Sequence, residues 1–133
     1  MDEKKKILVE FNNAVEVSYK TISGLLSCAF EGGSNYWAAI KKKINPNKTK
    51  FLSDLVLDGG KIIFFEHEED EPTDLVLDID AIKKGIKLLL SWRYDDGASY
   101  MNQNAKNVFT DNYDAETGDC FLQFCLFGEV KYG

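Results

Sequence analysis

The stretch Lys61-Ile62-Ile63-Phe64-Phe65-Glu66 decides the fold that this sequence predicts. Its four consecutive apolar residues form a run of strand length. A strand that lacks polar alternation is typical of the centre of a sheet, where both of its faces are covered. We therefore expect residues 61–66 to be a central strand, with the other strands arranged around it.

The following segment supplies a partner for this strand. Residues 75–79 alternate as a strand does, which places Leu75, Leu77 and Ile79 together on one face. The intervening residues 66–74 are acidic and contain Pro72. A hairpin with a long solvated loop is the simplest arrangement of these two strands.

A second strand signal lies near the N-terminus. Ile7, Val9 and Phe11 alternate over residues 6–11, and Val15 and Val17 continue the pattern after an Asn-Asn turn. Residues 34–40 fit either a helix or a strand. Val130 and Tyr132 suggest a short terminal strand.

Three longer helices are expected, each with a polar cap. Ser18 begins the first, whose apolar residues recur every three or four positions up to the Gly pair at 32–33. Asp80 caps the second, which has an apolar stripe over residues 82–90. Asp114 opens the third, whose run 120–127 is apolar nearly all round and is therefore buried in the core or against a second copy; Gly128 ends it.

The remaining segments are less regular. A short helical piece is expected around residues 51–56, ended by Asp58-Gly59-Gly60. Residues 93–113 lose periodicity, so this stretch is functional, locally mobile or hides an element. Together these elements predict one α+β domain over residues 1–133, with about three helices on a small, mainly antiparallel sheet.

The composition fits a folded, acidic protein inside a cell. The chain has 133 residues, of which 44% are hydrophobic and 13% aromatic, and it contains 2 prolines, which is unlike a disordered chain. No apolar run approaches the roughly 18–20 residues that a membrane span needs. The N-terminus lacks the features of a signal peptide. We expect no membrane contact and a cytoplasmic location.

The charge is unevenly distributed along the chain. The formal net charge is −6; residues 61–133 hold 7 basic residues against 15 acidic ones, whereas residues 1–60 hold 9 against 7. A negative field repels phosphates and favours basic partners, so nonspecific nucleic-acid binding by the whole surface is disfavoured. A local phosphate contact stays open at Lys41, Lys42, Lys43, Lys48 and Lys50.

Signatures of catalysis are missing from the sequence. It contains no phosphate-binding Gly-rich loop, no zinc-protease motif and no serine nucleophile elbow. The chain has an odd number of cysteines, Cys28, Cys120 and Cys125, which favours free thiols over a disulfide framework. The sequence also lacks a set of four zinc ligands. The only histidine, His67, lies in the acidic loop. We therefore expect no enzyme activity, no metal and no cofactor.

Two groups of residues are candidates for binding a partner. Glu68, Glu69, Asp70 and Glu71 lie in the acidic loop, where they either bind a cation, imitate nucleic-acid phosphates for a basic partner, or keep the hairpin in water. The second group is aromatic and polar. Its members are Asn35, Tyr36 and Trp37 after the Gly pair, and Arg93 and Tyr94 after the second helix.

The aromatic candidates have two interpretations each. Tyr36 and Trp37 either anchor an interface or stack on bases, or Trp37 folds back over the core. Arg93 beside aromatic rings suits an anion or purine pocket, or it neutralises carbonyls at the end of a helix.

Two segments resemble small hypothetical proteins of bacteriophages and prophages. They are Gly32-Gly33-Ser34-Asn35-Tyr36-Trp37 and the C-terminal residues from Asp114-Ala115-Glu116-Thr117 to Leu126-Phe127-Gly128-Glu129. The resemblance covers both ends of the chain better than the middle, and it carries over no catalytic residues. It implies a context: small acidic phage accessory proteins often bind host machinery, and anti-defence and anti-CRISPR proteins are among them.

These observations predict a non-enzymatic binding protein of phage type. Its acidic surface would occupy a basic host protein or nucleoprotein complex, as an inhibitor of host defence does. The alternative is a small-molecule sponge that holds a nucleotide signal between Arg93, Tyr36 and Trp37. An enzyme of unfamiliar kind is a third hypothesis. The apolar terminal helix also suggests a homo-oligomer.

Overall fold

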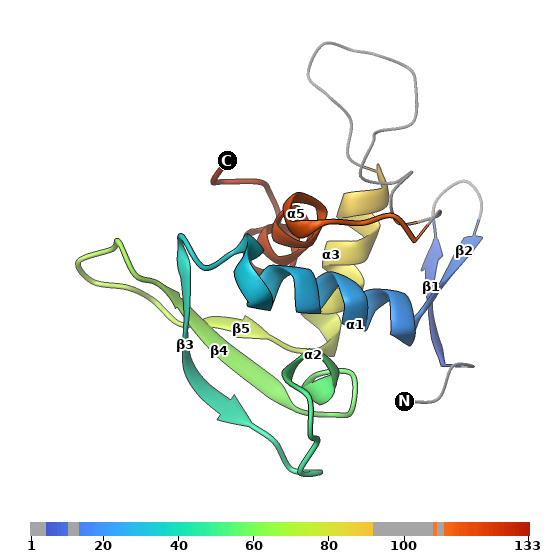
Figure 1. The fold of residues 1–133 in the computed structure, drawn as a ribbon, viewed down its shortest axis with the longest axis horizontal. Coiled ribbons are helices and arrows are strands. Elements are labelled where there is room, and N and C mark those ends of the chain that lie inside the picture. The colour runs from blue at the N-terminus through green and yellow to red at the C-terminus, as the bar shows by residue number, and fades with distance from the viewer. Residues whose placement is uncertain (1–4, 11–13, 92–107, 109–110) are drawn as a thin grey trace.

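The strand expected at the centre of a sheet is β4 (Lys61–Glu66), and it does lie between two antiparallel strands. Its neighbours are β3 (Ala38–Ile44) and β5 (Leu75–Leu77), in the order β3-β4-β5. The computed structural model describes residues 5–10, 14–91, 108 and 111–133. Within these ranges, four α-helices and two small antiparallel sheets form one compact α+β fold, as predicted (Figure 1).

The expectation that both faces of β4 are covered is wrong. Ile62, Phe64 and Glu66 are buried on one face, whereas Ile63 and Phe65 on the other face are only half-buried. The helices α1, α3 and α5 all lie on the side of the first face (Figure 1). An apolar run shows that a strand is central, but it does not show that a layer covers each side.

The undecided segment 34–40 divides between a turn and a strand. Residues 34–37 form a turn, and β3 begins at Ala38 and continues through the three lysines 41–43. The pairing of β3 with β4 shifts between Ile40 and Lys42, so Lys41 occupies a bulge. The other side of β3 is an edge of the sheet.

The helix after the hairpin begins earlier than predicted. β5 ends at Leu77, and Ile79 is the first residue of α3 (Ile79–Ser91) rather than part of the strand. Asp78, not Asp80, occupies the capping position, because its Oδ1 accepts a hydrogen bond from Ala81 N at 2.8 Å. A carboxylate that satisfies a free N–H of the first turn allows the helix to start at this point.

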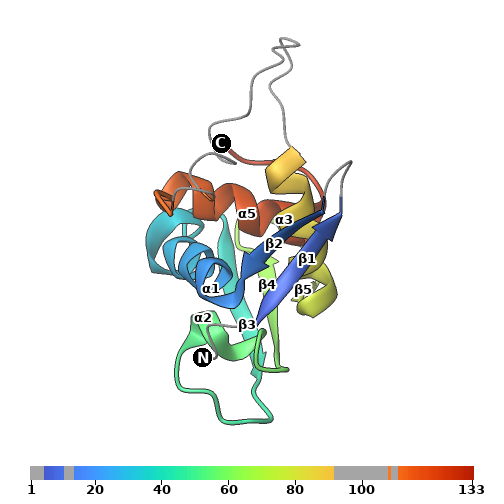
Figure 2. The same cartoon turned by 90° about the vertical axis from the view of Figure 1, so that its right-hand side faces the viewer.

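The N-terminal half follows the expected order. β1 (Lys6–Glu10) and β2 (Ala14–Ser18) form an antiparallel hairpin that lies beside α1 and α3 (Figure 2). Ser18 Oγ accepts a hydrogen bond from Thr21 N at 3.2 Å and so caps α1 (Tyr19–Cys28). One π-helical turn, η1 (Ala29–Gly33), follows and ends at the predicted Gly pair. The short helix α2 (Leu52–Leu55) is also present where expected.

The C-terminal helix α5 (Ala115–Phe127) forms the centre of the core. Asp114 Oδ1 accepts a hydrogen bond from Thr117 N at 3.0 Å, and Gly128 ends the helix with φ 77°, both as predicted. Residues 117–125 are all buried, and α5 packs against both α1 and α3. The apolar helix is therefore covered by its own chain.

The last residues do not form the expected terminal strand. Val130 and Tyr132 are half-buried and lie outside any helix or strand. The backbone N–H groups of Lys131 and Tyr132 instead donate to the side chain of Gln123 on α5. The side chain of the buried Gln123 thus accepts the backbone hydrogen bonds that a neighbouring strand would otherwise accept.

Candidate functional site

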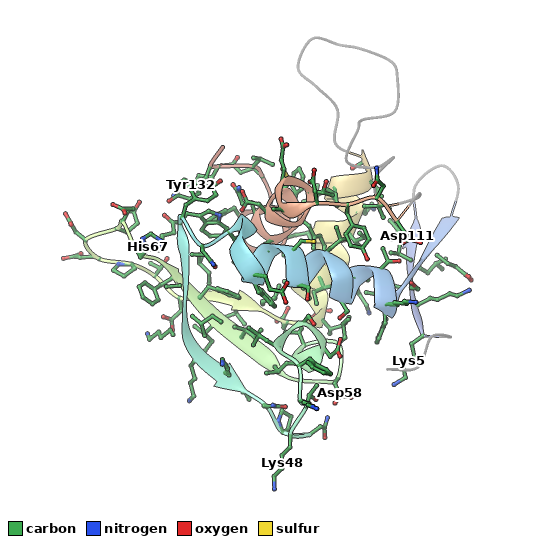
Figure 3. The ribbon with its side chains drawn as sticks, viewed as in Figure 1. Lys5, Lys48, Asp58, His67, Asp111 and Tyr132 are labelled. Carbon is green, nitrogen blue, oxygen red and sulfur yellow. The ribbon has the colours of Figure 1, made fainter. Side chains whose placement is uncertain are left out.

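Two of the predicted binding segments come together at one end of the three-stranded sheet. His67 N donates to Trp37 O at 3.1 Å, and His67 Nε2 forms a hydrogen bond of 3.0 Å with Asn35 O. Asn35 and Tyr36, which are both exposed, therefore lie beside the start of the acidic loop. Figure 3 labels His67 at this point. We call the residues gathered here the hairpin surface: Asn35, Tyr36, Glu68, Glu69, Asp70 and Glu71.

Trp37 does not belong to this surface. Its side chain is 1% exposed, and its ring stacks on the ring of Tyr132 with a centroid distance of 5.4 Å. Its Nε1 donates to Asp119 Oδ1 at 2.7 Å. Trp37 therefore folds over the core, the second of the two interpretations, and it is unavailable as an exposed anchor or as a platform for a base.

Tyr36 is exposed but fixed in position. Half of the residue, 51%, is accessible, while its hydroxyl donates to Asp119 Oδ2 at 2.7 Å. Burial, followed by the hydrogen bond to Asp119 and the negative charge of Asp119, raises the pKa of Tyr36 to about 12. The phenol therefore stays protonated and keeps its donor role, so the ring is held ready for contact.

A buried carboxylate connects the Tyr36 turn to α5. Besides Tyr36 Oη and Trp37 Nε1, Asp119 accepts hydrogen bonds from Ser34 Oγ at 2.7 Å and from Gln123 Nε2 at 3.0 Å. Ser34, Asp119 and Gln123 are all buried. Four donors around one carboxylate match the acceptor capacity of its two oxygens.

Gln123 extends this network to the C-terminal residues. Its Oε1 accepts from Lys131 N at 2.8 Å and from Tyr132 N at 2.7 Å, and its Nε2 also donates to Tyr132 O at 3.1 Å. Sequence reasoning missed both Asp119 and Gln123. The available signal was two polar residues, four positions apart, within a segment of α5 that is otherwise apolar.

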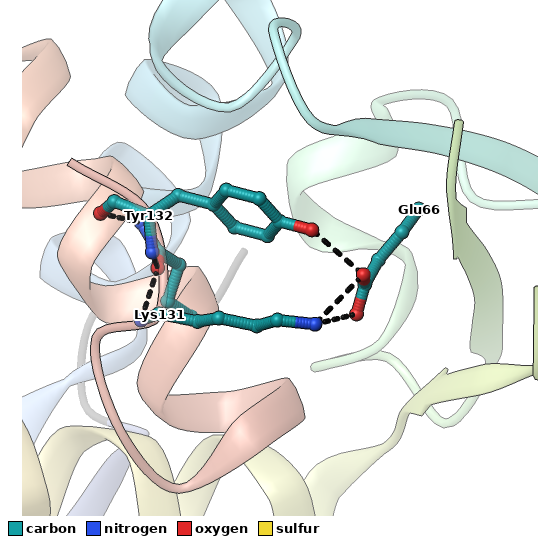
Figure 4. Close-up of polar contacts among 4 residues, drawn as sticks. Glu66, Lys131 and Tyr132 are labelled. Atoms are coloured by element: carbon teal, nitrogen blue, oxygen red, sulfur yellow. Dashed lines mark hydrogen bonds and ion pairs between the residues drawn. The ribbon is translucent and has the colours of Figure 1, made fainter. Parts of the chain in front are cut away.

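The start of the acidic hairpin is held by a second network, shown in Figure 4. The Glu66 carboxylate accepts from Lys131 Nζ at 3.0 and 2.9 Å and from Tyr132 Oη at 2.7 Å. Burial on its own would raise the pKa of Glu66, but the Tyr132 hydroxyl and the Lys131 ammonium outweigh burial and lower it. Glu66 is therefore a brace, unlike the exposed acids that follow it.

We expect Glu66→Gln to reduce the stability of the protein in a pH-dependent way. Because the pKa of Glu66 is lowered on folding, its contribution is present above the ordinary glutamate value of 4.5 and is lost as the pH falls through the folded value. Chemical denaturation should show a deficit of about 1 kcal/mol at neutral pH, since the Lys131 partner is partly exposed. The deficit should shrink below pH 4.5. Glu71→Gln, which changes an exposed acid of the same loop, should leave stability nearly unchanged; a constant deficit at every pH would contradict the brace.

The loop itself presents its charges to solvent. Residues 67–74 are all exposed. A depression of about 220 Å³ lies beneath the loop. It is lined by Glu66, Glu69, Glu71, Pro72, Thr73 and Lys131. Lys131 offsets the charge of Glu66 there, whereas Glu69 and Glu71 add further negative charge, so the depression is suited to a cationic side chain brought by a partner.

The described residues offer no activated thiol and no metal centre. The thiols Cys28, Cys120 and Cys125 are free, and burial is the first cause that raises the pKa of each, to about 12 for Cys120. A raised pKa leaves little reactive thiolate. Across the ranges that the structure describes, no three His, Cys, Asp or Glu residues are grouped as metal ligands. Arg93 and Tyr94 lie outside those ranges.

No family model, no curated protein and no solved structure matches this chain. Within the described segments, no helix has the length and apolar character that crossing a membrane requires. The interpretation of the hairpin surface therefore depends on its own chemistry.

Proposed function

We propose that this chain is a non-enzymatic binding protein whose hairpin surface docks onto a basic host protein or nucleoprotein complex. The observation that carries the proposal is the placement of four exposed acids, Glu68 to Glu71, on a hairpin whose base is braced at Glu66. The resemblance to phage accessory proteins supports the context: an inhibitor of a host defence complex.

The physical argument combines steering with preorganisation. Clustered carboxylates raise the rate at which a positively charged surface is encountered, and they do so most strongly at low salt. The bonds of His67 and Glu66 hold the start of the loop in place, so less ordering is needed on binding than for a free loop. The exposed half of Tyr36 adds a rigid aromatic contact beside the charges.

The acids of the hairpin should be required for capture of the host partner. We expect the wild-type protein to retain a basic protein or nucleoprotein from a bacterial host lysate. The variant E68Q/E69Q/D70N/E71Q should lose it. The matched variant E16Q/E31Q/D80N/E116Q removes the same charge from exposed positions outside the β4–β5 hairpin and should retain the partner. Equal capture by all three proteins would contradict the proposal.

A nucleotide panel tests the alternative of a small-molecule sponge. A ligand that binds only the folded state raises the melting temperature. Because the Trp37 ring is already stacked on Tyr132, we expect no base-stacking site there and no nucleotide-dependent rise. A rise that Tyr36→Ala abolishes would favour the sponge instead.

A further inference from the structure

One face of the three-stranded sheet is largely apolar, and no segment that the structure describes covers it. In the register of β3, β4 and β5, paired residues share a face, so the half-buried side chains of β4 lie with exposed residues of its neighbours. Val76 is 41% exposed and Ile44 40% exposed. We call this the open face: Lys42, Ile44, Lys61, Ile63, Phe65 and Val76.

Two outward-facing side chains of β4 are apolar. Ile63 and Phe65 are as apolar as the buried Ile62 and Phe64, although they face outward. Only one ion pair among the described residues spans β4: Lys41 Nζ, on β3, lies 2.7 Å from Oδ1 of Asp74, the residue just before β5. Both side chains are about half exposed, 58% and 48%, so the bridge passes outside the core.

The charges at the two ends of the open face are opposite. Lys61 lies at the end that leads to the exposed Lys48 and Lys50, and Lys42 lies next along the face, opposite Ile63. The acidic loop 68–71 lies at the other end. Figure 3 labels Lys48 and His67 at these two ends of the sheet. The face is therefore an apolar centre between a basic end and an acidic end.

We propose that the open face binds a second copy of this chain, sheet against sheet. A two-fold axis that lies between the sheets and runs along the strands would place like charges together. A two-fold axis perpendicular to the strands places the basic end of each copy against the acidic end of the other. Charge complementarity selects this second arrangement, and the apolar residues Ile63, Phe65 and Val76 then meet at about the 10 Å spacing of packed sheets.

This dimer differs from the one suggested by the apolar terminal helix. α5 is buried within its own chain, so it offers no comparable surface. The proposal does not depend on the proposed function, although a dimer would place the acidic loop against a second copy. A basic host partner would then compete with dimer formation for the same loop.

The test is the molar mass of the purified wild-type chain, measured by sedimentation over a range of concentrations. We expect the mass of two chains, with association that weakens as salt rises. Val76→Lys should weaken association at least about tenfold, because it places a charge in the apolar centre. Leu8→Lys, at a residue 56% exposed on β1 of the other sheet, is the matched control and should leave association unchanged. A wild-type chain that stays monomeric, or a Val76→Lys variant that still dimerises, would overturn the proposal.

A charge exchange tests the orientation of the two copies. K42E/K61E should weaken association, because acids would then face acids. Adding E69K/E71K to the same chain should restore it. Failure of either step would contradict the antiparallel arrangement. Capture of a host partner by monomeric Val76→Lys separates the two proposals, since loss of the dimer then leaves partner binding intact.

Discussion

Asp119→Ala should destabilise the protein more than any other single substitution discussed here. Its carboxylate accepts hydrogen bonds from four side chains, and three of these donors, on Ser34, Trp37 and Gln123, are buried. Each buried donor left without an acceptor costs about 1–3 kcal/mol. We expect a loss of at least about 3 kcal/mol from a total that is typically about 5–15 kcal/mol. Equilibrium unfolding in denaturant measures this loss.

The loss should also spread to the hairpin surface. Without Asp119, the Tyr36 hydroxyl loses its acceptor and the nearby negative charge, so the pKa of Tyr36 should fall from about 12 toward its ordinary value of 10. A spectroscopic titration of the tyrosines reports this change. Asp119→Asn keeps one acceptor oxygen and should be intermediate in stability. Glu129→Ala, an exposed acid just beyond α5, should change stability by no more than about 0.5 kcal/mol. Asp119→Ala with wild-type stability would show that the network is dispensable.

Gly118→Ala should destabilise the protein although alanine favours helices. A Cβ at this position would lie 2.7 Å from Leu25 O, 2.7 Å from Cys28 Cβ and 2.9 Å from Ala29 N, so it would meet the backbone of α1. Overpacking of this kind costs about 1–3 kcal/mol. Alanine gains about 1 kcal/mol in helix propensity over glycine, and this gain reduces the cost only in part. Thermal and denaturant unfolding should both show the loss.

The size of the side chain at residue 118 provides the control for this prediction. Compared with alanine, valine adds two methyl groups at the same contact, so Gly118→Val should destabilise the protein further. The order of stability should therefore be glycine, then alanine, then valine. An alanine variant that equals or exceeds the wild type would mean that α1 and α5 can separate without cost, which their close contact argues against.

Elements with local signals could be predicted from the sequence. Ser18 and Asp114 cap their helices with side chains that lie within three residues of the N–H groups they satisfy. Gly128 ends α5 because glycine readily adopts a positive φ. The central position of β4 could be predicted for a similar reason, because its apolar run lies within six consecutive residues.

Features that depend on distant residues could not be predicted in this way. Glu66 looked like one acid among several, and only the approach of Lys131 and Tyr132 distinguishes it as a brace. The sequence allows Trp37 to lie at a surface or, as favoured, over the core, and only its distant partners Asp119 and Tyr132 decide for the core. Residues 63 and 65 were expected to be covered, because a sequence does not state how many layers pack on a sheet.

The salt dependence of partner binding tests the central claim most directly. The host protein captured by the wild-type chain would be purified, and its Kd would be measured at increasing salt for the wild type, E68Q/E69Q/D70N/E71Q and E16Q/E31Q/D80N/E116Q. We predict that binding of the wild type and of the second variant weakens steadily with salt, while the hairpin variant binds poorly at every salt concentration. An affinity that ignores both salt and the four hairpin acids would contradict the claim.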